Sequence, residues 1–262
     1  ILALEGSTKP IVAAVHSVCM GGGLELALGC HYRVASPGTQ VALPEVKIGL
    51  IPGAGGTQRL PRLIGIQGAL DLILTGKRLS GKKAEKMGLV DACVPEQLLR
   101  EQAIRFAQQK KPHARRMPDL KPGKLAADLP KWATEGNPLG RKLIQKKARE
   151  MVDEKTKGFY PASYKALEAV FEGHDMALGK ALELEAQLFG QLAVTKESAS
   201  LVHLFHATTA LKKHRYKDAA KERFGKTRAS SVGIIGSGFM GAGIATVAVE
   251  KGLSVRLSDP NK

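Results

Sequence analysis

The sequence predicts an α/β fold in which strands and helices alternate along the chain. Short apolar runs such as Ile11–Val15 have the length and composition of strands buried in a core. Two such runs lead through glycines into helical patterns, at 21–28 and 236–251. Elsewhere the apolar residues recur at helical spacing over two long stretches, 58–107 and 141–213.

The N-terminal segment is predicted to run strand, glycine turn, helix. We expect the strand at Ile11–Val15 to be buried on both faces. Three glycines, 21–23, then open a short buried helix at Leu24–Leu28. A turn of this kind leaves the N–H groups of the helix's first turn aimed at one point. Further strand-like segments follow at His31–Ala35 and Val41–Pro44.

Residues typical of turns and linkers follow the strand-like segments at His31–Ala35 and Val41–Pro44. Pro52–Thr57 is rich in turn residues, and Thr57 is predicted to cap the helix that follows. The helical pattern beyond it is broken at 74–76 and at 88–90. Five prolines within 110–140 predict a linker-like segment before the second helical stretch.

The charge of the chain favours an anionic partner. Of the net charge of +16, residues 101–160 supply +8 and residues 211–228 supply +6. Such clustering fits nucleic acid, an acidic lipid surface or a polyphosphorylated cofactor, although a solvated helix face is the alternative for either run. Aromatic residues are only 5% of the chain and no recognition motif is present, so nucleic acid is the least favoured partner.

The cysteines and histidines predict neither disulfides nor a metal site. Cys19, Cys30 and Cys93 are odd in number and lie in apolar contexts, which favours free thiols in a reducing compartment. No two of them have metal-ligand spacing, and the histidines form no cluster with them. No apolar run approaches the length of a membrane span.

Two glutamates, Glu25 and Glu45, lie in a segment that has almost no charge. Between Ile11 and Gln58 the only other ionisable side chains, apart from histidines and cysteines, are Tyr32, Arg33 and Lys47. Glutamate is rarely buried unless it is paired or functional, so the two predict a carboxylate pair placed in an apolar site for chemistry. The alternative, that both point to water at the ends of elements, stays open.

The glycine motif after Ser231 has the features of a dinucleotide-binding turn. Gly236, Gly238 and Gly241 follow an apolar strand and open a helix, with Asp259 at the end of the next strand. The first glycine permits the tight turn, the second lets a pyrophosphate approach, and the third allows close helix–strand packing. Asp259 is predicted to accept hydrogen bonds from a ribose, which favours NAD over NADP. A glycine turn in another kind of βαβ unit is the alternative.

The motifs around the two glutamates resemble those of the enoyl-CoA hydratase (crotonase) family, over 9–27, 43–60, 74–76 and 84–91. With the glycine motif, and with Lys157–Ala162 and Thr195–Ser198, the chain is similar to multifunctional fatty-acid oxidation enzymes over nearly its whole length.

The resemblance implies three segments. Residues 1–110 are expected to be the C-terminal part of a crotonase-type ββα spiral. Residues 111–228 are expected to form a helical linking region with a basic linker, and residues 229–262 the first βαβ of a Rossmann-type 3-hydroxyacyl-CoA dehydrogenase domain. The first oxyanion donor and the start of the hydratase core are expected upstream of this sequence, and the dehydrogenase's catalytic histidine downstream. The chain is therefore expected to be an internal piece of a longer enzyme and to be inactive by itself.

The resemblance also implies roles for single residues. Glu25 is expected to act as the base toward water and Glu45 as the proton donor to C2 when water adds to a trans-2-enoyl-CoA thioester. The N–H of Gly22 is expected to be one of two oxyanion donors, and NAD is expected to oxidise the 3-hydroxyacyl-CoA product in the complete enzyme. Enoyl isomerisation, thioester hydrolysis and a binding or scaffold role without activity are the alternatives.

The expected partners and location follow from the same resemblance, except the membrane surface, which follows from the basic charge of the chain. They are acyl-CoA, a thiolase beta subunit and an anionic membrane surface, in the bacterial cytoplasm or, alternatively, the mitochondrial matrix.

Overall fold

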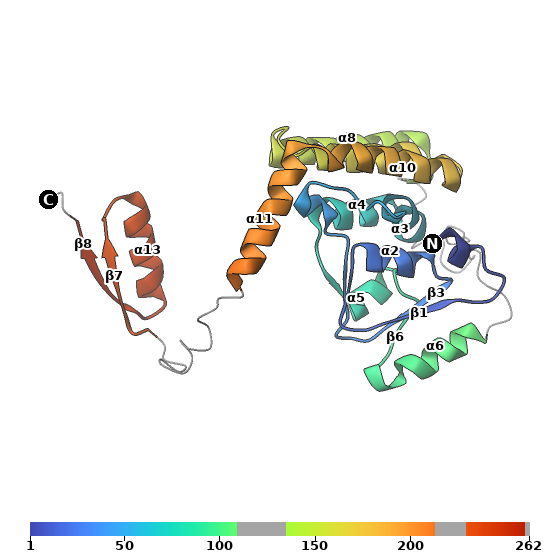
Figure 1. The fold of residues 1–262 in the computed structure, drawn as a ribbon, viewed down its shortest axis with the longest axis horizontal. Coiled ribbons are helices and arrows are strands. Elements are labelled where there is room, and N and C mark those ends of the chain that lie inside the picture. The colour runs from blue at the N-terminus through green and yellow to red at the C-terminus, as the bar shows by residue number, and fades with distance from the viewer. Residues whose placement is uncertain (109–134, 213–228, 260–262) are drawn as a thin grey trace. The chain divides into compact units, whose positions relative to one another are not determined.

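The computed structural model describes residues 1–108, 135–212 and 229–259 (Figure 1). The chain divides into two compact units, Ile1–His206 and Ala207–Lys262, which are described separately. The segments predicted as a proline-rich linker and as a basic linker lie largely outside the described residues. The predicted segment boundaries near 110 and 228 therefore stay a prediction.

Two small sheets form the base of the first unit. One is entirely parallel, with the order β1-β3-β6: β1 (Val12–Val15), β3 (Tyr32–Ala35) and β6 (Ala92–Cys93). The other has the order β2-β4-β5, with its first pair parallel and its second antiparallel: β2 (Val18–Met20), β4 (Gln40–Ala42) and β5 (Leu79–Ser80). The expectation that β1 is buried on both faces is wrong, because β1 is an edge strand and is only partly covered, whereas the central β3 is fully buried.

Helices follow each pair of strands, in the order that the sequence predicts. The first pair leads into α2 (Gly22–Gly29), and the second into η1 (Glu45–Ile48), α3 (Gly56–Ile64) and α4 (Ile66–Thr75). The remaining helices of this part are α1 (Leu2–Glu5), α5 (Gly81–Lys86), η2 (Glu96–Leu98) and α6 (Leu99–Ala107). The strands β5 and β6 were not predicted, since each has two residues and lies between helical segments.

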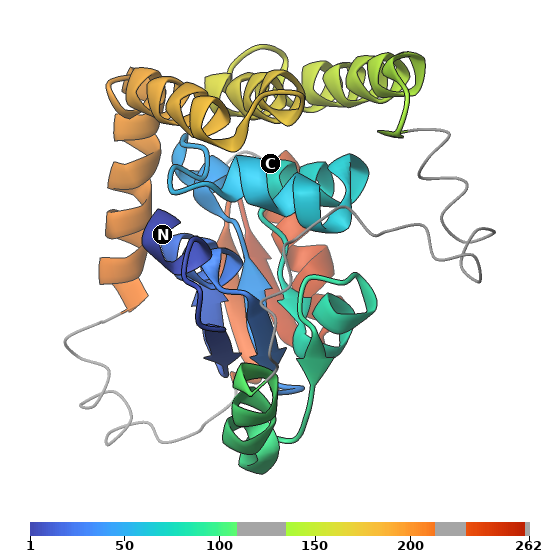
Figure 2. The same ribbon diagram turned by 90° about the vertical axis from the view of Figure 1, so that its right-hand side faces the viewer.

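Four longer helices complete the first unit: α8 (Pro138–Thr156), α9 (Pro161–His174), α10 (Leu178–Ala193) and α11 (Lys196–Lys212, whose last residues belong to the second unit). Pro161 is the first residue of α9. Figure 1 and Figure 2 show the long helices lying over α3 and α4: α9 contacts both, α10 contacts α3, and α8 packs against α9. Side chains of both groups share one core, among them Leu60, Ile66, Ala166, Val170 and Leu188.

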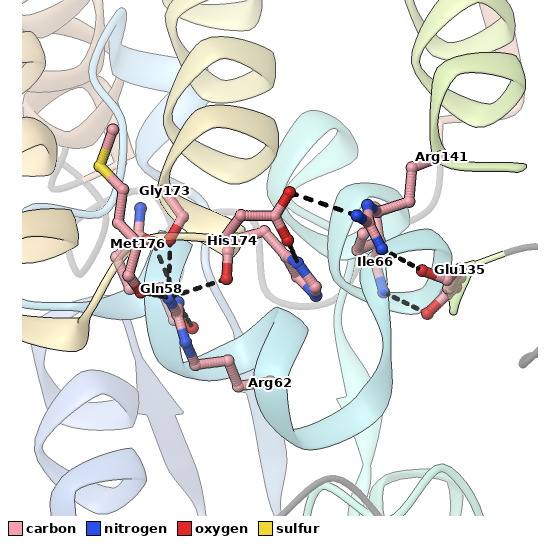
Figure 3. Close-up of polar contacts among 9 residues, drawn as sticks. Gln58, Arg62, Ile66, Glu135, Arg141, Gly173, His174 and Met176 are labelled. Carbon is pink, nitrogen blue, oxygen red and sulfur yellow. Dashed lines mark hydrogen bonds and ion pairs between the residues drawn. The ribbon is translucent and has the colours of Figure 1, made fainter. Parts of the chain in front are cut away.

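Arg62 joins α3 to the C-terminal end of α9 (Figure 3). Its Nη2 donates to the carbonyls of Gly173 at 2.7 Å, His174 at 3.3 Å and Met176 at 3.1 Å. Its Nη1 donates to the carbonyl of Gln58 at 2.8 Å. The last carbonyls of a helix lack partners within the helix, so a cation placed there satisfies them and opposes the helix dipole.

Glu135 caps the start of α4 from a distant part of the chain (Figure 3). The residue before α4 is Gly65, which has no side chain to accept the first N–H groups. Glu135 accepts from the N–H of Ile66 at 2.9 Å and of Gln67 at 3.0 Å, and Arg141 Nη1 donates to the Glu135 carbonyl at 3.0 Å. The packing of the long helices on α3 and α4 is therefore reinforced by polar contacts at helix ends.

The second unit contains a strand, a helix and a parallel strand, as predicted. These are β7 (Ser231–Ile235), α13 (Phe239–Glu250) and β8 (Ser254–Ser258). Ser231 pairs with Ser254 and Ile235 with Ser258, so both strands end at the same edge. In a parallel arrangement this edge holds the turn into the helix and the end of the second strand, where a nucleotide motif places its glycines and its acidic residue.

Candidate active site

The turn between β2 and α2 brings the first helical turn next to Glu45. Gly21, the residue before α2, has a φ of +54°, and its N–H donates to the Ala42 carbonyl at 3.0 Å. A Cβ on Gly21 would lie 2.8 Å from Glu45 Oε1, so a side chain does not fit here without displacing the carboxylate. Glycine is required both for the backbone angle and for the close approach.

Glu25 is held in the interior by two backbone groups of the loop before α3. Its side chain is only 3% exposed, and Oε1 accepts from the N–H of Ala54 at 2.7 Å and of Gly56 at 2.8 Å. A Cβ on Gly56 would lie 2.9 Å from the same oxygen. The alternative that Glu25 points to water is therefore wrong.

Glu45 begins η1 and is less completely satisfied. Its Oε2 is buried and is the one buried side-chain nitrogen or oxygen without a hydrogen-bond partner in the described part of the chain. The pKa of Glu45 is raised to about 7, mainly by burial and in part by the negative charge of Glu25. The two carboxyl groups are thus close enough to influence each other's protonation.

The charged form of Glu25 is favoured by two backbone N–H groups and a positive charge, whereas that of Glu45 is favoured only by its own backbone N–H. Burial raises the pKa of Glu25, but the N–H groups of Ala54 and Gly56 and the positive charge of Arg59 act in the opposite direction. For Glu45, the neighbouring charge is negative and adds to the effect of burial. This difference favours ionisation of Glu25 over ionisation of Glu45, the arrangement that separates a base from an acid.

Gly22 is the first residue of α2 and directly follows Gly21 of the same turn. The first N–H groups of a helix have no partner within it, and a Cβ on Gly22 would meet no atom within 4 Å. The N–H of Gly22 therefore belongs to a helix start, where the helix dipole favours negative charge. This geometry is compatible with the predicted oxyanion donor.

The structure adds one buried carboxylate that sequence reasoning missed. Glu185 of α10 is 1% exposed and accepts from the N–H of Gly55 at 2.5 Å, the N–H of Thr57 at 2.9 Å and the Thr57 hydroxyl at 2.5 Å. Thr57 is consequently not a helix cap as predicted: α3 begins at Gly56, and the hydroxyl points to Glu185 instead.

A signal for Glu185 was present in the sequence. The buried positions of α10 are Ala181, Glu185, Leu188 and Leu192, which recur at the three- and four-residue spacing of a helix face. A glutamate in the apolar register of an amphipathic helix is costly to bury unless it has partners, so it merits the same attention as Glu25.

The residues predicted to bind a dinucleotide come together at one edge of the second unit. Gly236 has a φ of +99°, and a Cβ on Gly241 would lie 1.8 Å from the Gly236 carbonyl oxygen. Gly238 precedes α13, and a Cβ there would meet nothing within 4 Å. Asp259 Oδ2 accepts from the N–H of Ser237 at 2.5 Å and from its hydroxyl at 2.7 Å. The roles predicted for the three glycines fit this geometry.

Two further properties concern the described residues alone. In the ranges that the structure describes, no three or more histidine, cysteine or acidic side chains gather as metal ligands would. Within the same ranges, no helix combines the length and apolarity needed to cross a membrane.

Comparison with known families identifies both ends of the chain. Residues 1–118 match the family described as enoyl-CoA hydratase/isomerase. Residues 231–262 match the family described as 3-hydroxyacyl-CoA dehydrogenase, NAD binding domain. The hydratase/isomerase match covers Glu25, Glu45 and Gly22, and the second match covers the glycine motif and Asp259.

Curated relatives contain both segments in one chain. The fatty acid oxidation complex subunit alpha of Vibrio vulnificus is 45% identical over 253 residues, which are 95% of this chain and 34% of the relative. The subunit of the same name from Shewanella amazonensis is 47% identical over 259 residues, 98% of this chain and 35% of the relative. The chain thus spans about a third of the length of these relatives.

A solved structure confirms the predicted fold. The enoyl-CoA hydratase/isomerase from Pseudoalteromonas atlantica superimposes with a TM-score of 0.50 at 22% identity, covering 79% of this chain and 65% of that one. At this identity the likeness supports the fold alone. The α/β arrangement of strand pairs and helices in the first unit is therefore that of the hydratase/isomerase fold.

Proposed function

We propose that the complete protein hydrates trans-2-enoyl-CoA thioesters to 3-hydroxyacyl-CoA in fatty-acid β-oxidation. The observation that carries this proposal is the buried carboxylate pair, in which Glu25 is held by two N–H groups and Glu45 has a raised pKa and an oxygen without a partner. The enoyl-CoA hydratase/isomerase family match supports the substrate class.

The reaction divides one water molecule between two carbons. Ionised Glu25 accepts a proton from water while the water oxygen bonds to C3, and protonated Glu45 gives its proton to C2. The C2–C3 double bond becomes a single bond, and the proton gained by Glu25 passes on to Glu45 to restore the starting state. Negative charge that develops on the thioester oxygen is stabilised by the N–H of Gly22 at the start of α2.

The second unit is proposed to bind NAD. The turn formed by Gly236, Gly238 and Gly241 and the N-terminal end of α13 fit a pyrophosphate, and Asp259 lies beside this turn, where it can accept from a ribose hydroxyl. When bound, NAD supplies a hydride acceptor for the 3-hydroxyacyl-CoA product. The match to an NAD binding domain supports this cofactor.

The names and sources of the relatives and the charge of the chain support proposals for the partners and the location. The relatives are named as alpha subunits of a complex, which supports a partner subunit, and we expect a thiolase beta subunit there. The bacterial source of these relatives supports the cytoplasm of a bacterium as the location. An anionic membrane surface remains a proposal that rests on the basic charge of residues 101–160.

Substitution of each glutamate tests the hydratase proposal. In the complete protein, Glu25→Gln and Glu45→Gln should each lower kcat for hydration of a trans-2-enoyl-CoA by about 10²- to 10⁴-fold with little change in KM, because each group acts mainly in the transition state. Glu183→Gln, at an exposed position of α10, is the control and should keep wild-type turnover.

Near-normal hydration by either active-site variant would contradict the proposal. Assay of 3-enoyl-CoA in parallel distinguishes hydration from isomerisation, since the same carboxylates can move a proton between C2 and C4. Conversion of 3-enoyl-CoA without hydration of the 2-enoyl substrate would favour the isomerase alternative.

A further inference from the structure

Helix α10 packs one face directly against the loop that holds Glu25. A Cβ on Gly53 would lie 2.6 Å from the ring of Phe189, and a Cβ on Gly55 would lie 3.1 Å from Leu182 Cδ2. Leu182, Glu185 and Phe189 are three, four and seven residues apart, so they lie on one face of the helix. The glycines of this loop therefore permit the backbone to touch α10.

The backbone N–H groups of residues 54–57 donate alternately to Glu25 and to Glu185. The N–H groups of Ala54 and Gly56 donate to Glu25, at 2.7 and 2.8 Å. Those of Gly55 and Thr57, between and after them, donate to Glu185, at 2.5 and 2.9 Å. Four consecutive N–H groups are thus divided between two side chains that are 160 positions apart in the sequence.

This alternation couples the positions of the two carboxylates. Each peptide plane of the loop is fixed by its own hydrogen bond, and neighbouring planes share a Cα atom. Because the four residues are consecutive, a shift of the loop away from Glu185 also moves the N–H groups of Ala54 and Gly56 relative to Glu25. The Thr57 hydroxyl adds a third donor on the Glu185 side.

We propose that Glu185 is a positioning residue for the hydration reaction, which holds the loop so that the N–H groups of Ala54 and Gly56 both reach Glu25 Oε1. This inference rests on the proposed function, because Glu25 is the base in that reaction. It assigns a role in the active site to α10, which lies outside the matched hydratase/isomerase segment, residues 1–118.

The site of Glu185 is built for an acceptor. A carboxyl group that is 1% exposed needs partners, and three donors face it. The pKa of Glu185 is raised to about 7, because burial and the negative charge of Glu25 outweigh the Thr57 hydroxyl and the two N–H groups, which lower it. Both the charged and the protonated form can accept hydrogen bonds here, so the loop stays held across neutral pH.

Three substitutions of α10 in the complete protein test the role. Glu185→Gln replaces one accepting oxygen by an NH₂ group that faces donors, and should lower kcat for hydration between about 10- and 100-fold with KM changed less than about threefold. Glu185→Asp keeps the acceptor but withdraws it by one methylene, and should recover part of the loss. Glu183→Gln is the matched control and should have no effect.

A double-mutant cycle separates positioning from a general structural effect. If Glu185 acts through Glu25, adding Glu185→Gln to Glu25→Gln should cause almost no further fall in kcat. An equal fall in both backgrounds, or wild-type kcat for Glu185→Gln, would overturn the proposal while leaving the hydratase function intact.

Hydrogen exchange provides a readout that does not need activity. The amides of Ala54–Thr57 should exchange faster in Glu185→Gln than in Glu183→Gln, including the two amides that donate to Glu25. Faster exchange at Gly55 and Thr57 alone would contradict the coupling. If the wild-type protein does not hydrate enoyl-CoA, the proposed function fails, and this measurement still decides whether Glu185 orders the loop.

Discussion

Two glycine-rich loops of this chain each lead into a helix and offer backbone N–H groups to carboxylates, yet their surroundings are opposite. The loop before α3 is in the interior, where Glu25 and Glu185 are at most 3% exposed. In the described part of the second unit, the loop before α13 is exposed at Ser237 and Gly238, and Asp259 accepts from Ser237.

The difference shows how backbone N–H groups of a glycine-rich loop at a helix start can serve two kinds of chemistry. In the interior loop, burial raises the pKa of Glu25, Glu45 and Glu185, which suits proton transfer near neutral pH. In the open loop, the N-terminal end of α13 has space around Gly238, which suits a charged pyrophosphate that approaches from water. The environment of the helix start, more than its glycines, separates the two functions.

The largest expected effect concerns the cost of ionising a buried carboxyl group. The folded pKa of Glu45 is raised to about 7 from an ordinary value of 4.5, so its protonated form stabilises the fold at pH below 4.5 and this contribution is lost as pH rises through 7. Glu45→Gln has no such dependence. The free energy of unfolding of the variant relative to wild type should therefore rise by up to about 3 kcal/mol between pH 4.5 and 8.

Differential scanning calorimetry of both proteins at pH 5 and pH 8 measures this change as a difference in Tm. Asp259→Asn in the open loop is the control, because its comparison with wild type should vary less over the same range. A Tm difference for Glu45→Gln that is equal at both pH values would mean that burial does not set the protonation of Glu45.

The next prediction concerns a substitution at the start of α13. In Gly241→Ala, the new Cβ would lie 1.8 Å from the Gly236 carbonyl oxygen, and backbone atoms must move to make room. Overpacking of this kind costs about 1–3 kcal/mol, so NAD binding by the complete protein should weaken by roughly 5- to 150-fold. Isothermal titration calorimetry measures the change in Kd.

Gly243→Ala, on the same helix, is the matched control. A Cβ there would meet no atom within 4 Å, so the affinity for NAD should stay within about twofold of wild type. Equal losses for the two variants would show that the helix, and not the Gly236–Gly241 contact, sets the affinity.

The smallest expected effect concerns the turn at the start of α2. Gly21→Ala places a side chain at a φ of +54° and a ψ of −132°, a sparsely populated region that costs about 1–3 kcal/mol, and the new Cβ would press on Glu45 Oε1. Because that oxygen ends a flexible side chain, it can shift, and kcat for hydration should fall by only about 5- to 30-fold.

Gly23→Ala tests the same turn without the contact, since a Cβ there would meet nothing within 4 Å. Its steady-state kcat should remain near wild type. A loss in Gly23→Ala as large as that in Gly21→Ala would argue that the flexibility of α2, and not the position of Glu45, limits the reaction.

Local patterns in the sequence determined much of the fold and part of the site. The strand–turn–helix order at both glycine loops, the start of α9 at Pro161, and the isolation of Glu25 and Glu45 among apolar residues all depend on neighbours in the chain. Backbone geometry and side-chain periodicity are short-range properties, so one sequence is enough to predict them.

Tertiary structure alone decided the rest. The alternation of N–H groups between Glu25 and Glu185, the cap that Glu135 supplies to α4, and the exposure of β1 as an edge strand join segments that are far apart in the chain or depend on sheet order. Such contacts leave no local pattern, because any buried donor is satisfied equally well by an acceptor from anywhere in the fold. Burial, which sets the pKa of each carboxyl group, is likewise a property of the packed core and not of the residues beside it in sequence.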